Sequence, residues 1–308
     1  MSDIILSYNK CTLCNRRCSV NRAFGEKGFC NSLDKPTVAR AALHFWEEPV
    51  ISGTNGSGTI FFSGCSLGCI YCQNKEISCG KGGTVINETR LSEIMLNLEK
   101  QGAHNVNFVT PTHFAPSVVI ATKEARENGL SLPVVYNTGS YDTVETIRSL
   151  SGTIDIYLPD YKYFRSKTAA EYSFASDYPN AAILAIGEMV RQKPIPLFDN
   201  GIMTSGVIVR FLLLPGHLAE AKLALSTVYQ RFGNSVYLSL MNQYTPMPNM
   251  KAPLNRCVTR EDYRSFVSYA EKIGVVNGFT QEFGTASESF IPSFDGLGMG
   301  LSHLGTTE

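Results

Sequence analysis

The stretch Gly58-Thr-Ile-Phe-Phe62-Ser-Gly64-Cys65-Ser-Leu-Gly-Cys69-Ile-Tyr-Cys72 joins an apolar run to a loop with three cysteines. The run is β-branched and aromatic and ends at Ser63-Gly64, so it is predicted as a buried strand. Three thiolates on one short loop can each hold one iron of a [4Fe–4S] cube and leave the fourth iron open. Gly68 lets the loop wrap closely around an inorganic core, because glycine tolerates backbone angles that other residues avoid. The stretch therefore predicts a cluster loop after the first strand of a sheet.

Downstream of this loop, strand-like and helix-like segments alternate. Strands are predicted at 106–109, 132–136, 154–158, 207–214 and 236–241. Helices are predicted at 90–101, 116–128, 218–231, 260–273 and, interrupted at Tyr178-Pro179, within 169–190. Repeated strand–helix units imply parallel strands covered by helices. Six units without a glycine-rich dinucleotide fingerprint favour an α/β fold with a partial (β/α)6 barrel of the TIM type over a doubly wound sheet.

Three regions are expected along the chain. Residues 1–55 form a cysteine-rich amino-terminal extension, because they lack long periodic segments. Residues 56–280 form the partial barrel. Residues 281–308 form a carboxy-terminal tail that packs on or near the barrel; this tail is rich in glycine and poor in helix formers.

The overall composition excludes several classes of partner. The chain has 308 residues, 27 basic and 27 acidic, so no electrostatic footprint for nucleic acid or an anionic membrane is expected. The longest apolar run, Val207 to Leu214, is interrupted by Arg210 and is too short to span a bilayer. No secretory signal follows Met1, so a cytoplasmic location is expected. The cysteines are grouped, which in a reducing compartment is typical of metal ligands.

A second group of cysteines precedes the first strand, in the pattern Cys11-x2-Cys14-x3-Cys18-x11-Cys30. Four thiolates saturate either a tetrahedral zinc ion or a closed [4Fe–4S] cluster, and the sequence leaves both open. Arg16, Arg17 and Arg22 can offset the negative charge of such a site. Because no ligand position stays open, a structural or electron-relaying role is expected. The single cysteines Cys79 and Cys257 receive no role.

The Cys65–Cys72 loop resembles the signature of the radical S-adenosylmethionine (SAM) superfamily. Over roughly residues 56–245 the chain resembles, more closely, pyruvate formate-lyase activating enzymes and their uncharacterised relatives with an amino-terminal four-cysteine extension. The resemblance implies that a [4Fe–4S] cluster, reduced by a partner such as flavodoxin or ferredoxin, cleaves SAM to methionine and a 5′-deoxyadenosyl radical. That radical abstracts hydrogen from a protein, peptide or small molecule. The most specific function that the resemblance implies is activation of a glycyl-radical enzyme.

The resemblance also implies roles for particular residues. Cys65, Cys69 and Cys72 match the cluster ligands, Tyr71 matches the aromatic residue beside the adenine, and Arg210 matches the arginine that holds the SAM carboxylate. Segments 137–138 and 158–162 resemble stretches that bind a monovalent cation, although Asn137 stands where the family has Asp. The family's Gly-Gly-Glu segment is replaced by Val109–His113. The remaining candidates for contact with SAM or the cation are Thr110, Thr112, Asn137, Thr138, Asp160 and Gln243.

Other interpretations of these residues remain open. Arg210 is alternatively an exposed arginine at a strand end, and Asp160 alternatively pairs with Lys162 or Arg165. His113 is a proton donor, a substrate contact or a surface histidine. The alternative function is a non-catalytic iron–sulfur or zinc protein in electron transfer or scaffolding. The sequence names neither the substrate nor the oligomeric state.

Overall fold

A computed structural model describes residues 8–282, 294 and 296–299. One sheet runs through the centre, in the strand order β10-β9-β8-β6-β5-β4-β2-β1-β3, and β7 pairs with β8 outside this path. The strands are β1 (Thr37–His44), β2 (Ser57–Phe62), β3 (Thr84–Val85), β4 (Val106–Val109), β5 (Val134–Thr138), β6 (Ile156–Pro159), β7 (Leu197–Asp199), β8 (Ile202–Leu212), β9 (Tyr237–Met241) and β10 (Gly278–Thr280).

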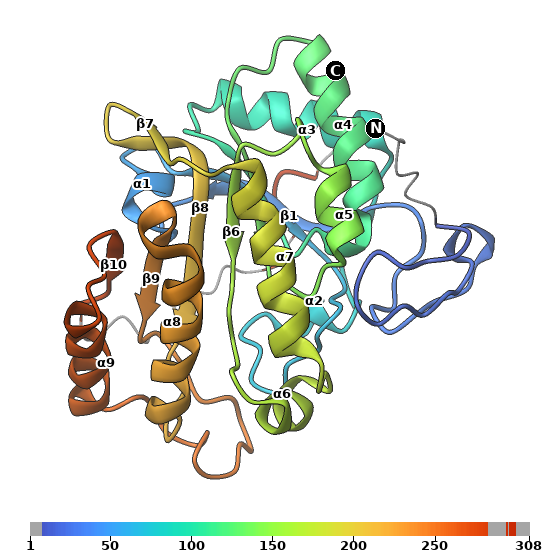
Figure 1. The fold of residues 1–308 in the computed structure, drawn as a ribbon. Helices are drawn as coiled ribbons and strands as arrows, with labels where there is room; N and C mark the ends of the chain where they lie inside the picture. The colour runs from blue at the N-terminus through green and yellow to red at the C-terminus, as the bar shows by residue number, and fades with distance from the viewer. Residues whose placement is uncertain (1–7, 283–293, 295, 300–308) are drawn as a thin grey trace, which may run out of the picture.

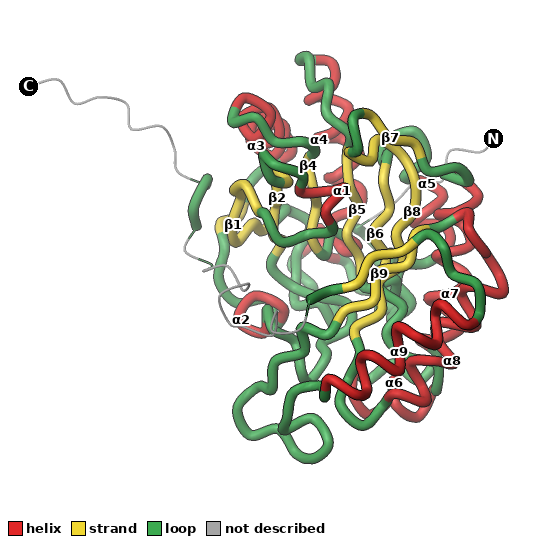
Figure 2. The backbone as a smooth tube through the Cα atoms, turned by 90° about the vertical axis from the view of Figure 1, so that its left-hand side faces the viewer, coloured by secondary structure: helices red, strands yellow, loops and turns green. Residues whose placement is uncertain are grey.

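The strands from β2 to β10 in this order are parallel to their neighbours. Helices lie outside the curved sheet (Figures 1 and 2). They are α1 (Pro49–Ser52), α2 (Lys75–Ser78), α3 (Glu88–Lys100), α4 (Ala115–Glu127), α5 (Val144–Ser149), α6 (Ser166–Ser173), α7 (Tyr178–Gln192), α8 (Leu218–Phe232) and α9 (Arg260–Lys272), with 3-10 turns η1 (Arg22–Phe24), η2 (Thr112–Phe114) and η3 (Gly233–Ser235). The predicted partial barrel with parallel strands is confirmed.

Helix α3 shows how the sequence pattern produces this packing. Leu91, Ile94, Met95 and Leu98 recur on one helix face, and all four are buried in the main core. The helix begins after Asn87, whose side chain accepts a hydrogen bond from the backbone amide of Arg90. That cap satisfies an amide that the first helical turn leaves free. The side of the sheet covered by such helices holds the main core, and a second apolar cluster that includes Ile51, Val135 and Ile208 lies on the opposite side of the strands.

Strands β1 and β10 were not anticipated from the sequence. β1 pairs antiparallel with β2, and its three alanines hide it because alanine is depleted in strands. β10 adds a further parallel strand beside β9. Most of the tail 281–308 lies outside the described residues. Of its described residues, Phe294 contacts Phe61, and the carbonyl of Leu297 accepts a hydrogen bond from the amide of Ala41.

The described part of the amino-terminal segment, residues 8–36, contains one short 3-10 turn and no strand or α-helix. It packs on the side of the barrel near α4 and α5 (Figure 1). Tyr8 bonds Ser117 of α4, and Leu13 accepts hydrogen bonds from Thr143 and Thr146 at the start of α5. Among the described residues, none of the helices has the length and apolarity that crossing a membrane requires.

Candidate active site

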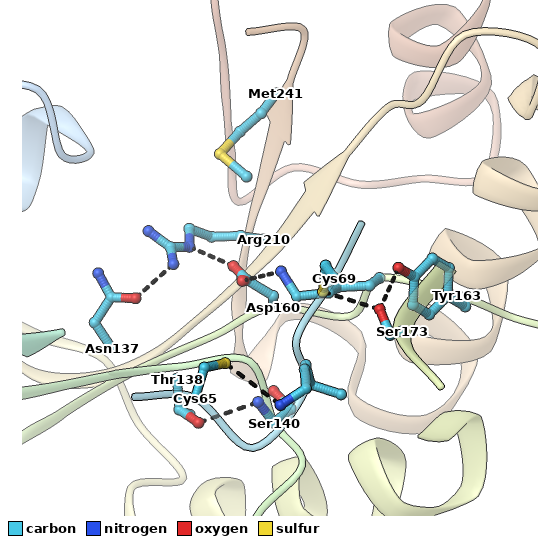
Figure 3. Close-up of polar contacts among 12 residues, drawn as sticks. Cys65, Cys69, Asn137, Thr138, Ser140, Asp160, Tyr163, Ser173, Arg210 and Met241 are labelled. Carbon is cyan, nitrogen blue, oxygen red and sulfur yellow. Dashed lines mark hydrogen bonds and ion pairs between the residues drawn. The ribbon is translucent and has the colours of Figure 1, made fainter. Parts of the chain in front are cut away.

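The loop after β2 carries three cysteines at the carboxyl end of the parallel strands. The thiol groups of Cys65, Cys69 and Cys72 all line one cavity of about 240 Å³. The backbone amide of Leu67 donates to Cys65 Sγ at 3.4 Å, and Ser173 Oγ donates to Cys69 Sγ at 2.9 Å (Figure 3). The loop therefore presents three sulfur atoms to a common space and supplies hydrogen-bond donors to two of them.

Burial makes these sulfurs poor thiolates in the absence of a bound cation. Burial, reinforced by the neighbouring Cys69, raises the pKa of Cys65. Burial and the same neighbour raise the pKa of Cys72 to about 12. A metal that binds thiolate offsets this cost, because ligation replaces the proton. The site thus fits a positively charged inorganic group better than three free thiols.

Two glycines allow the loop to follow its path. Gly64 has φ +94°, and a Cβ there would lie 2.4 Å from Ser32 Oγ and 2.7 Å from the carbonyl oxygen of Cys30. Gly68 has φ +66°, and a Cβ there would approach the Phe29 ring at 3.2 Å. Both positions combine a left-handed backbone with close packing against the amino-terminal segment. The loop is therefore shaped partly by a segment about 35 residues upstream of it.

Tyr71 lies within a cluster of tyrosines beside the loop. Its ring packs edge-on against Tyr163, Tyr172 and Tyr244, and its hydroxyl lies 2.8 Å from that of Tyr163. The Tyr163 hydroxyl in turn contacts Ser173 Oγ, the group that bonds Cys69. Tyr71 also lines the cavity. The structure thus brings the predicted adenine-flanking residue to the cavity wall and fixes its ring by packing.

The cavity collects nearly all of the residues that the sequence analysis proposed for cofactor binding. Its lining includes Tyr71, Thr110, Thr112, Asn137, Asp160, Arg210 and Gln243. Thr138 does not line it; its hydroxyl donates to Asp142 Oδ2 at 2.6 Å. These residues come from the loop after β2 and from the ends of β4, β5, β6, β8 and β9. One sheet edge therefore gathers side chains that lie up to about 170 residues apart in the sequence.

Arg210 is the centre of a buried polar network in this cavity (Figure 3). Its Nε donates to Asp160 Oδ1 at 2.8 Å, and its two terminal nitrogens bond Glu47 Oε2 at 3.1 Å and Asn137 Oδ1 at 2.5 Å. Lys162 Nζ donates to the other oxygen of Asp160 at 2.6 Å. The interpretation of Arg210 as an exposed residue at a strand end is wrong. The pairing of Asp160 with Lys162 is confirmed, and the structure adds Arg210 as its second partner.

Charge balance explains the protonation of this network. The Arg210 and Lys162 cations hold the pKa of Asp160 below its usual range, although burial opposes them. Burial raises the pKa of Glu47, against the favourable charge of Arg210 and hydrogen bonds from Asn107 and Asn137. Asp160 is therefore the ionised partner of Arg210. Because both its oxygens bond cations, nothing in this geometry supports the monovalent cation.

Glu47 was missed by the sequence analysis. It belongs to the connection between β1 and α1, and it lines the cavity. Asn107 and Asn137 both donate to Glu47 Oε1 at 3.1 Å. In the sequence, Glu47 is marked only by the acidic pair Glu47-Glu48 before Pro49, a pattern that also suits the start of a helix. The burial of the Glu47 carboxylate can be recognised only from the folded structure.

The segment after β4, which replaces the expected Gly-Gly-Glu, is unusual in backbone and burial. Thr110 has φ +57°, a left-handed conformation that costs energy for a non-glycine residue. Its amide donates to the carbonyl of Asn137 at 2.8 Å. His113 is buried, its Nε2 lies 2.8 Å from the carbonyl oxygen of Ser63, and burial with the Arg22 charge lowers its pKa to about 3. His113 is therefore neither a surface residue nor part of the cavity lining.

The other cysteines divide into a group and two single residues. Cys11, Cys14 and Cys30 are buried and Cys18 is exposed, whereas Cys79 and Cys257 are both exposed. Burial, with the surrounding thiols Cys30, Cys11 and Cys18, raises the pKa of Cys14. Across the part of the chain that the structure describes, no group of three or more His, Cys, Asp or Glu side chains is arranged to hold a single metal ion.

Comparison with known proteins supports one feature of this site. Residues 51–177 match the family model of a 4Fe-4S single cluster domain, and the Cys65–Cys72 loop lies inside that range. The chain is 28% identical over 276 residues to the uncharacterized protein MJ0674 of Methanocaldococcus jannaschii, a match that covers 86% of this chain and 75% of that protein.

Two solved structures have a partly similar fold. The first is SuiB of Streptococcus suis bound to the precursor peptide SuiA, with a TM-score of 0.49, 11% identity, and coverage of 72% of this chain and 47% of SuiB. The second is methylornithine synthase (PylB), with a TM-score of 0.43, 15% identity, and coverage of 73% of this chain and 70% of that protein. The chain thus spans about half the length of SuiB. Neither likeness is strong enough to indicate a shared activity.

Proposed function

We propose that this chain is a radical SAM enzyme in which Cys65, Cys69 and Cys72 bind a [4Fe–4S] cluster and leave one iron open for SAM. The observation that carries the proposal is that three loop thiols line the same cavity as a buried network of charged side chains. The match of residues 51–177 to a 4Fe-4S single cluster domain supports the cluster. Three cysteines in the cavity lining suit a cluster with one open position.

The cofactors supply the chemistry and the chain positions them. When bound, the reduced cluster and SAM supply a 5′-deoxyadenosyl radical that abstracts hydrogen from the substrate. Tyr71 forms a rigid apolar wall beside the loop, because three tyrosine rings pack around it. Thr110 offers its hydroxyl at the cavity surface for the amino group of SAM. Water exclusion by the buried lining protects a reactive radical from side reactions.

Arg210 can bind SAM only if one of its present hydrogen bonds is broken. Its three nitrogens already bond Asp160, Glu47 and Asn137. For Arg210 to receive the SAM carboxylate, Glu47 or Asn137 must give up its bond. Glu47 is the weaker partner, because burial raises the pKa of its carboxyl group whereas the pKa of Asp160 is lowered. We therefore infer that SAM binding at Arg210 displaces Glu47.

Substrate and reductant approach the loop from more than one side in this proposal. Cys69 lines the inner cavity and also an outer cavity of about 550 Å³, bordered by the end of α6, by α2 and by residues 249–252. A reducing partner of the flavodoxin or ferredoxin class supplies the electron, and the substrate is a protein, peptide or small molecule. Activation of a glycyl-radical enzyme is the most specific form of the proposal.

The test is SAM cleavage by protein purified and reconstituted without oxygen. With dithionite as reductant, the wild-type chain is expected to convert SAM to 5′-deoxyadenosine and methionine. Cys69→Ala is expected to abolish this product, whereas Cys79→Ala, which removes an exposed thiol, is expected to retain it. Intact SAM in the presence of a fully assembled cluster would contradict the enzyme and favour a non-catalytic iron–sulfur protein.

A further inference from the structure

Four cysteines of the amino-terminal segment gather in a part of the chain that has almost no regular structure. Three of them, Cys11, Cys14 and Cys30, are buried. Backbone bonds fold the segment back on itself: the amide of Cys11 donates to the carbonyl of Val20, and the amide of Ser19 donates to that of Cys11. A segment with so little regular structure commonly depends on a ligand for its order. The residues lie outside the range of the family match.

A buried arginine in this segment points to a negative sulfur. Arg22 is 1% exposed and donates to the backbone carbonyls of Ser32, Leu33 and His113. Its remaining polar contact is Cys11 Sγ, 3.7 Å from one terminal nitrogen. Within the described residues no carboxylate forms an ion pair with Arg22. A buried charge requires a counter-charge, and Cys11 would supply one as a metal-bound thiolate.

An amide donor reaches another sulfur of the group. The amide of Phe29 points at Cys18 Sγ at 3.5 Å. The same relation exists in the cluster loop, where the amide of Leu67, two residues after Cys65, donates to Cys65 Sγ at 3.4 Å. Hydrogen bonds to the sulfur ligands tune the properties of iron–sulfur clusters. Each cysteine group thus supplies at least one hydrogen-bond donor to its sulfurs.

The position of this group bears on the two metals that the sequence leaves open. A zinc ion has no redox chemistry, whereas iron–sulfur clusters exchange electrons. The group lies against the loop that falls within the match to a 4Fe-4S domain. A redox-active cluster suits a position beside another cluster, whereas a zinc ion there would only stabilise the segment.

Arg16 joins the two cysteine groups directly. It lies between Cys14 and Cys18, and its guanidinium donates to the carbonyls of Ser66 at 2.9 Å and Leu67 at 3.2 Å, both inside the cluster loop. It also bonds the carbonyls at the end of α6, and its guanidinium stacks 3.8 Å from the centre of the Phe29 ring. One side chain thus fastens the amino-terminal segment to the loop that follows β2.

We propose that Cys11, Cys14, Cys18 and Cys30 bind a second iron–sulfur cluster, closed by four thiolates. Arg22 is the buried counter-charge of this cluster, and Arg16 fixes it against the Cys65–Cys72 loop. The proposal goes beyond SAM cleavage and does not depend on it, because the buried arginine and the four grouped cysteines are present whatever the reaction is.

The test is the metal content of full-length chains purified and reconstituted without oxygen. Wild-type protein is expected to hold about eight iron atoms, four per cluster, and no stoichiometric zinc. The variant Cys14→Ser/Cys30→Ser is expected to lose half of the iron, and so is the variant Cys65→Ser/Cys69→Ser/Cys72→Ser. The control Cys257→Ser, which removes an exposed single thiol, is expected to keep all of it.

The loop variant decides the question even where the amino-terminal variant does not fold. After reduction it is expected to show the electron paramagnetic resonance (EPR) signal of one [4Fe–4S] cluster. About one zinc and no iron in the loop variant would overturn the proposal, as would unchanged iron in a folded amino-terminal variant. Eight iron atoms without SAM cleavage would instead contradict the proposed function and leave this inference standing.

Discussion

The Nε atom of Arg16 donates a hydrogen bond to the carbonyl oxygen of Ser66 at 2.9 Å, across 50 residues of sequence. Ser66 follows Cys65, so this bond holds the cluster loop at its first ligand. The bonds from Arg16 to Leu67 and to the end of α6 extend the same clamp. The four-cysteine segment is therefore a structural partner of the loop and not a free extension of the barrel.

Arg16→Ala is expected to loosen the cluster loop. The variant leaves four carbonyl acceptors without this donor, which costs at least about 2 kcal/mol of unfolding free energy. Hydrogen exchange at the amides of residues 64–70 is expected to become faster, and iron retention to fall. Arg16→Lys is expected to retain only part of the exchange protection and of the bound iron, because a lysine ammonium cannot reproduce the hydrogen bonds of a planar guanidinium. Arg17→Ala is the matched control, since Arg17 is largely exposed and forms an exposed ion pair with Glu145. Equal exchange in Arg16→Ala and Arg17→Ala would contradict the clamp.

Gly64→Ala is expected to displace the amino-terminal segment from the loop. The new Cβ meets Ser32 Oγ and the carbonyl of Cys30 at distances that real contacts do not allow. Gly82→Ala isolates the backbone effect, because Gly82 also has a positive φ but has open space around it. Gly82→Ala is expected to lower the free energy of unfolding by about 1 kcal/mol. Gly64→Ala is expected to lower it clearly more, and urea denaturation measures both. Similar midpoints for the two variants would refute the close packing.

Asp160→Asn is expected to destabilise the fold at neutral pH by about 3 kcal/mol, because two buried cations lose their shared partner. The pKa of Asp160 is lower in the folded state than its unfolded value of about 3.9. Its stabilising contribution is therefore complete above about pH 4 and is lost as the pH falls through the lowered folded value. Wild type and variant are expected to converge in acid. A constant difference in unfolding free energy from pH 7 to pH 2 would contradict the ionised pair.

His113→Gln is expected to flatten the pH dependence of stability. The folded pKa of about 3 lies below the unfolded value of about 6.5, so the unfolded state binds the proton first. The contribution of His113 is complete above about pH 6.5 and is lost toward pH 3, at about 1.4 kcal/mol per pH unit. His217→Gln, at a partly exposed histidine, serves as the control. Unfolding measured by urea at several pH values checks this, and parallel curves for wild type and His113→Gln would speak against a buried neutral imidazole.

The sequence predicted what depends on local pattern. The spacing of apolar residues predicted the longer helices α3, α4, α7, α8 and α9 and the six barrel strands, because burial of one helix face or of a whole strand leaves a pattern in consecutive residues. The short helices α1, α2 and α5 were not predicted. The three-cysteine loop and Arg210 were recognisable because a charge or a run of thiols stands out among apolar neighbours. Residues at strand ends, such as Asp160 and Asn137, followed from the rule that parallel strands end at one edge.

The rest depends on contacts between distant segments. Glu47 reaches Arg210 across 163 residues, and nothing near Glu47 in the sequence marks it as buried. Strand β1 was missed because its alanines carry a weak strand signal, and only pairing with β2 fixes it. The docking of Arg16 on Ser66 likewise has no local signature. Such features are set by tertiary packing, which a single sequence does not display.

The central claim, an open iron held by three loop cysteines, is tested most directly by EPR of the reduced protein with SAM labelled by ¹⁵N in its amino group. The predicted result is a change in the cluster signal and a hyperfine coupling to ¹⁵N, both absent in Cys69→Ala. A spectrum that is the same with and without SAM, from protein that holds its full iron content, would contradict the claim.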